Sequence, residues 1–74
     1  MLATGRIDLV VTTIHYIYVI ELKLTKNGGI SAAEKQIIDN NYLESFKADK
    51  RKVVGLAIEL EDMGKGLLDW KVVE

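Results

Sequence analysis

The sequence predicts a small α/β domain: two strands, one helix and two further strands, built as a mixed sheet with the helix on one face. Three observations support this prediction. The chain has 74 residues, enough for a single domain over residues 1–74. Four segments show the apolar patterns of strands, and one segment between them has helical periodicity. No repeat, low-complexity tract or linker divides the sequence.

The four strands are predicted from short apolar runs bounded by turn-forming residues. Residues 5–11 and 16–24 are close enough in sequence to form an antiparallel hairpin. Residues 53–58 form a continuous apolar run, which is typical of a strand covered on both faces. Residues 67–73 alternate apolar with charged side chains, so we expect a half-exposed edge strand there.

The helix is predicted to begin at Ser31 and to run to about Phe46. Ser31 and Glu34 have the spacing of a capping box, in which each side chain accepts a hydrogen bond from the other residue's backbone N–H. The apolar residues of this segment recur at helical spacing: Ala33, Ile37, Ile38, Tyr42 and Phe46. We expect Tyr42, Phe46 and Trp70 to lie in the core rather than to stack on bases.

The first two strands are apolar on both faces, but one helix covers only one face of a sheet. Another element must therefore cover the second face. We expect this to be a second copy of the chain, in a homodimer or larger homo-oligomer.

Composition restricts the partners and the location of the protein. The net charge of −1 excludes coating of nucleic acid through bulk positive charge. No apolar run reaches the roughly 20 residues of a membrane span, and no signal peptide is visible, so we expect no membrane partner. The absence of cysteine fits the reducing cytoplasm.

Charged residues inside the apolar hairpin indicate a functional site. Glu21 and Lys23 are two residues apart on one strand and so share a face, where an unpaired buried charge is costly. A turn of two or four residues puts Asp8 on the same face; with four, Asp8 opposes Val19 and is the diagonal neighbour of Glu21. A turn of odd length would move Asp8 to the opposite face unless a bulge restored it.

Two carboxylates on one face repel each other unless a cation lies between them. A hard divalent ion with oxygen ligands, above all Mg²⁺, would relieve that repulsion. Lys23 would then orient or deprotonate a water molecule for attack on a phosphate. On residue types alone, a surface ion-pair cluster at the sheet edge is the alternative.

The segments GRIDLVV and YIYVIELKL resemble the PD-(D/E)XK nuclease superfamily, whose signature is an Asp on one strand and Glu-x-Lys on the next. The resemblance continues through Ala33, Gln36, Tyr42 and KAD in the helical region, and through VVGLAIEL and DWKVVE. It points to the branch found C-terminal to AAA-type ATPase-like domains in bacterial proteins. Because the family's restriction-endonuclease-like fold opens with a further helix and strand, we expect an N-terminally truncated copy of that core.

This resemblance implies a metal-dependent phosphodiesterase. Asp8 and Glu21 would ligate Mg²⁺ or Mn²⁺ together with the backbone carbonyl of Leu22, and Lys23 would serve the attacking water. Gln36 matches a helix position that often lies beside the active site, so it joins the catalytic candidates.

The implied substrate is DNA or RNA. Because the net charge gives no general attraction, contacts to phosphate would depend on the metal and on a few cations such as Arg6 and Lys52. A second hypothesis keeps the same fold without catalysis, as a module for nucleic-acid binding or protein assembly.

Overall fold

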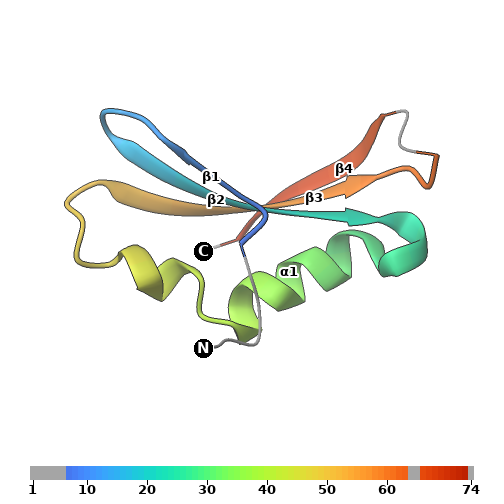
Figure 1. The fold of residues 1–74 in the computed structure, drawn as a ribbon, viewed down its shortest axis with the longest axis horizontal. Helices are drawn as coiled ribbons and strands as arrows, with labels where there is room; N and C mark the ends of the chain where they lie inside the picture. Colours follow the sequence, from blue (N-terminus) through green and yellow to red (C-terminus); the bar gives the residue numbers. More distant parts are fainter. Residues whose placement is uncertain (1–6, 64–65, 74) are drawn as a thin grey trace.

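The structure, a computed structural model, describes residues 7–63 and 66–73. It confirms the predicted order of two strands, one helix and two strands, with two short 3₁₀ segments added (Figure 1). The elements are β1 (Leu9–Thr12), β2 (Tyr16–Leu24), η1 (Thr25–Asn27), α1 (Gly29–Asp39), η2 (Leu43–Phe46), β3 (Lys52–Leu60) and β4 (Leu67–Val73).

The strands form one mixed sheet in the order β1-β2-β3-β4. β1 and β4 pair antiparallel with their neighbours, whereas β2 and β3 pair in parallel. Parallel neighbours need a long crossover, and α1 lies within it. The last strand is an edge strand, as its alternating pattern predicted.

The strand boundaries follow the pairing more closely than the apolar pattern. The bounds predicted for β2 and β4 are confirmed. β3 is longer at both ends than predicted, because it pairs with β2 over nine residues, from Tyr16↔Lys52 to Leu24↔Leu60. β1 begins only at Leu9. Gly5 and Arg6, the first residues of its predicted range, lie outside the described residues.

The predicted capping box at Ser31 is wrong, because α1 has already begun at Gly29. Gly28 and Gly29 have φ angles of 105° and 61°, a left-handed conformation that favours glycine and turns the chain directly into the helix. The backbone N–H of Ile30 donates to Oε1 of Glu59 on β3, at 3.1 Å. A carboxylate from a neighbouring strand thus takes the place of the local cap.

The helix is also shorter than predicted. It ends at Asp39, and Asn41 follows with a φ of 54°, which breaks the helical path before η2. No helix in the described part of the chain is long and apolar enough to span a membrane.

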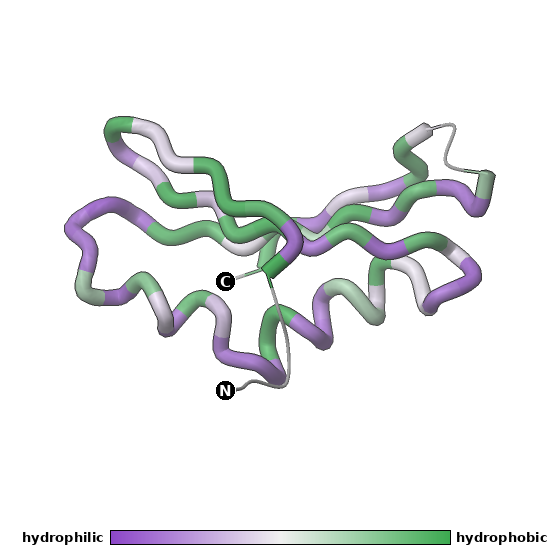
Figure 2. The backbone as a smooth tube through the Cα atoms, viewed as in Figure 1, coloured by the Kyte–Doolittle hydropathy of each residue, from purple (hydrophilic) through white to green (hydrophobic). Residues whose placement is uncertain are grey.

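The core lies between α1 and one face of the sheet, and Figure 2 shows hydrophobic residues concentrated along the strands. Its buried side chains come from β2, α1, β3, β4 and the segment after α1: Ile17, Val19, Ala33, Ile37, Tyr42, Ala57 and Val73. Phe46 packs against this cluster, as predicted. The prediction for Trp70 is wrong: it is 59% exposed, because it lies on the sheet face that α1 does not cover.

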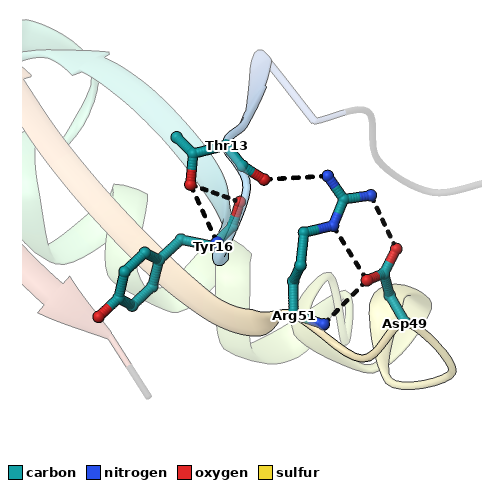
Figure 3. A network of polar contacts seen from close by, with 4 residues as sticks. All are labelled: Thr13, Tyr16, Asp49 and Arg51. Carbon is teal, nitrogen blue, oxygen red and sulfur yellow. Dashed lines mark hydrogen bonds and ion pairs between the residues drawn. The ribbon is translucent and has the colours of Figure 1, made fainter.

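An arginine ties the tip of the hairpin to the loop that leads into β3 (Figure 3). The guanidinium of Arg51 donates to both carboxylate oxygens of Asp49 at 3.0 Å and to the carbonyl oxygen of Thr13 at 3.1 Å. These contacts lower the pKa of Asp49 to about 2, with the side-chain hydrogen bond of Arg51 as the main cause. These bonds of Arg51 hold the first residues of β2 and β3 in place relative to each other.

Candidate metal-binding and catalytic site

The hairpin places Asp8 on the expected face but in a different register. Val10, not Asp8, pairs with Val19, so the strands are shifted by two residues from the predicted pairing. Thr13 is the cause: its hydroxyl accepts from the Tyr16 N–H at 3.0 Å and closes a turn with only two central residues. A shift of two preserves the face, and it brings Asp8 opposite Glu21 rather than diagonal to it.

Asp8 lies just before β1, and its side chain continues the pairing of the strands. Its Oδ2 accepts a hydrogen bond from the Leu22 N–H on β2, at 2.9 Å. The N–H and C=O of one strand residue point to the same side. The Leu22 carbonyl therefore also faces the edge of β2 at which Asp8 lies.

Glu21 is the one charged side chain that is buried among the described residues, with 1% of its surface exposed. Both carboxylate oxygens lack a hydrogen-bond donor within the described chain. Its nearest cation is Lys23, whose Nζ lies 3.6 Å from Oε2. Glu21 itself therefore does not fit the alternative of a surface ion-pair cluster at the sheet edge.

The environment of Glu21 disfavours its negative charge. The pKa of Glu21 is raised to about 7, with burial as the largest cause; the neighbouring Asp8 acts in the same direction, and Lys23 offsets only part of the rise. At neutral pH the carboxyl group is thus protonated more readily than a solvent-exposed glutamate. A second cation beside Asp8 and Glu21 would relieve both the desolvation and the repulsion.

A family model for the PD-(D/E)XK nuclease superfamily matches residues 1–70. The chain belongs to this superfamily. No curated protein and no solved structure matches the chain. The helix and the mixed four-stranded sheet are consistent with the restriction-endonuclease-like core that the sequence predicted.

Superfamily nucleases generally use divalent metals, and the oxygens at this site fit such an ion. Glu21 supplies two orphaned buried oxygens, Asp8 a neighbouring carboxylate, and Leu22 a carbonyl on the same edge. The described residues contain no group of three or more His, Cys, Asp or Glu that could enclose a metal. A site with two carboxylates suits Mg²⁺, which keeps several waters and needs few protein ligands.

The side chain of Gln36 is hydrogen-bonded to a residue just beyond the end of its own helix. Its Nε2 donates to the Tyr42 hydroxyl at 3.2 Å, and Asn40 donates to the same oxygen at 3.2 Å. Within the described chain, no hydrogen bond joins Gln36 to Asp8, Glu21 or Lys23. Its place beside the substrate stays a prediction, and no pattern in the sequence indicated its hydrogen bond to Tyr42.

The cations expected to contact phosphate are not gathered at the carboxylates. Lys52 pairs with Tyr16 in the β2–β3 ladder, whereas Glu21 pairs with Ala57. This offset of five residues separates Lys52 from Glu21 by roughly 16 Å along the strands. Arg6 lies outside the described residues. Within the described chain, Lys23 is the cation that pairs with Glu21.

Proposed function

We propose that the domain is a Mg²⁺- or Mn²⁺-dependent nuclease that hydrolyses phosphodiester bonds of DNA or RNA in the cytoplasm. The observation that supports this most is the carboxylate of Glu21, which is buried without a hydrogen-bond donor beside Asp8 in a chain of this superfamily. Such a group does not stabilise the fold, because a buried unpaired carboxylate is destabilising. A functional role would account for its presence.

The proposed roles follow from the positions of the side chains. Asp8, Glu21 and the Leu22 carbonyl would hold the metal, which supplies positive charge at the scissile phosphate. Lys23 is 27% exposed at its side chain, so its ammonium reaches water while it stays within 3.6 Å of Glu21. From there it orients the attacking water by donating a hydrogen bond. Gln36 is proposed to position the substrate.

A second function is favoured by a different observation. Because Glu21 is 1% exposed, its carboxylate offers a metal ion only a narrow approach from solution. If that approach is closed in solution, the domain serves as a catalytically inactive nuclease-fold module. It would then act in nucleic-acid binding or protein assembly.

Cleavage and metal binding by the same variants separate these functions. Lys23→Ala should reduce Mg²⁺- or Mn²⁺-dependent cleavage on the order of 100-fold or more and leave metal binding intact, because an ammonium is no metal ligand. Asp8→Asn should weaken Mg²⁺ binding at least about 10-fold in calorimetry and abolish cleavage. Single-stranded, double-stranded and structured DNA and RNA are the substrates to assay.

Lys35→Ala and Asp39→Asn are the matched controls. Lys35 and Asp39 form an exposed ion pair on α1 at 2.7 Å, so both changes should leave binding and cleavage within about twofold. Metal binding without cleavage of any substrate would favour the inactive module. Cleavage that survives Lys23→Ala and Glu21→Gln together would reveal a contaminant, and Mg²⁺ binding that survives Asp8→Asn would refute the proposed ligands.

A further inference from the structure

One whole face of the sheet is apolar and has no element of the described chain over it. In Figure 1, α1 and η2 lie together on one side of the strands, and the other side is bare. We call this side the open face. The strand pairing assigns to it Leu9, Val11, Tyr16, Tyr18, Ile20, Leu22, Val54, Leu56, Ile58, Trp70 and Val72.

The open face exposes large side chains on β1, β2 and β4, whereas its apolar residues on β3 are half-buried. Its exposed members are Leu9 (48%), Val11 (40%), Tyr16 (41%), Leu22 (36%), Trp70 (59%) and Val72 (45%). Lys52, at the start of β3, is the one charged strand residue that the pairing places on this face. Monomeric proteins rarely leave a continuous apolar surface of this kind in water.

We propose that the open face binds the open face of a second copy of this chain, forming a two-fold symmetric sandwich of two sheets. The size of the surface supports this occupant. Four strands about 4.8 Å apart and up to about 30 Å long cover roughly 500 Å² as a flat sheet. The side chains on this sheet add accessible area. The total approaches the area that each partner buries in a standard interface, about 800 Å².

The chemistry of the surface also favours self-association. A nucleic acid or a charged peptide needs opposite charges, and the open face offers one lysine at its end. An apolar sheet face fits another apolar sheet face at a separation of about 10 Å, with the side chains of both interdigitating. Trp70, Tyr16 and Tyr18 supply the aromatic side chains that dominate such interfaces.

This association leaves the candidate site free, so it does not depend on the proposed nuclease function. The side chains of Glu21 and Lys23 lie on the face that α1 covers, which is the reverse of the open face. Leu22 belongs to the open face by its side chain and to the candidate site only by its carbonyl, at the edge of β2. The two sites of a dimer therefore lie on its outer surfaces, and each site uses residues of a single chain.

Trp70 reports on the interface without any mutation, because it is the single tryptophan of the sequence. Light scattering of the purified chain should give twice the 8.3 kDa mass of one chain at micromolar concentration. On dilution to the monomer, Trp70 emission should shift to the red, and acrylamide should quench it more efficiently. A monomer at all concentrations, with Trp70 fully accessible to acrylamide, would overturn the proposal.

Val72→Glu and Leu9→Glu test the face at two separate strands. Each places a charge in the interface and should weaken the dimer on the order of 100-fold. Ile38→Glu is the matched control, since Ile38 is 53% exposed but lies on α1. It should leave the dimer intact. A dimer that survives both open-face variants while they remain folded by circular dichroism, or one that Ile38→Glu dissociates equally, would refute the assignment.

Discussion

The buried carboxyl group of Glu21 should make the stability of the folded chain depend on pH. Its pKa of about 7 in the folded chain compares with 4.5 for the free carboxyl group. The folded state therefore holds a proton that the unfolded state releases between these two values. The free energy of unfolding should fall as the pH rises from 4.5 to 7 and stay low above that range.

Glu21→Gln should remove this pH dependence. The variant should exceed the unmodified chain by about 1–3 kcal/mol at pH 8, where the carboxylate is charged, and match it near pH 4.5, where it is neutral. Urea unfolding in the presence of a chelator, at one protein concentration, measures both values. Glu44→Gln changes an exposed residue of the Glu44–Lys47 pair and serves as control. An equal effect of Glu21→Gln at both pH values would contradict the prediction.

The shared face of Asp8 and Glu21 was predictable from the sequence, but the direct pairing of these two residues was not. The face depends only on whether the turn has an even or odd number of residues. The register depends on the side chain of Thr13, whose hydroxyl closes a turn of two central residues where the predicted pairing assumed four. The bond from the Leu22 N–H to Asp8 is likewise invisible in a pattern of apolar and charged residues.

At the scale of elements, the start of α1 depends on contacts from outside the helix. A Cβ added at Gly29 would lie 2.7 Å from the carboxyl group of Glu59, and the φ of 61° disfavours any residue with a side chain. Thr25 also donates to Glu59, at 2.6 Å, so one carboxylate joins η1 and α1 to the end of β3.

Gly29→Ala should therefore destabilise the protein by about 1–3 kcal/mol in urea unfolding. The new methyl group must displace Glu59, and the backbone of residue 29 must keep a φ that is strained for alanine. Gly66→Ala is the control, since a Cβ there meets nothing within 4 Å. Its effect should stay within about 0.5 kcal/mol. Equal effects at the two glycines would show that Glu59 does not hold the helix.

The capping box at Ser31 failed as a prediction because the sequence shows only neighbours along the chain. Ser31 and Glu34 have the correct spacing, but Glu34 forms an ion pair with Lys71 on β4, at 3.0 Å. The acceptor that stabilises the helix start, Glu59, lies 29 residues further along the chain from Ile30. The length of β3 escaped prediction for the same reason, because β2 determines it by pairing.

At the scale of the whole molecule, the sequence predicted the fold class, the order of elements and a sheet face without cover. The uncovered face was predictable because the first two strands are apolar on both faces and one helix covers only one of them. The error at Trp70 has the same origin. A large aromatic side chain was assigned to the core of the chain, whereas it lies on the open face, where a core would form only between two copies.

An association of this kind should make thermal stability depend on concentration. By mass action, each tenfold rise in protein concentration should raise Tm by about 4 °C for a dimer of this size. Differential scanning calorimetry over a series of concentrations measures the slope. The Val72→Glu variant should show no slope, and a constant Tm for the unmodified chain would contradict the prediction.

The hydrogen bond between the Leu22 amide and Asp8 has a practical consequence for spectroscopy. A backbone amide that donates to a carboxylate has a proton resonance shifted downfield, and its exchange with deuterated solvent is slow. The approach of a cation to Asp8 draws electron density from the carboxylate and weakens that bond. The Leu22 amide should then move upfield and exchange faster. The Leu22 amide, which is hydrogen-bonded directly to Asp8, thus reports on changes at this carboxylate. Its signal needs no label beyond nitrogen-15.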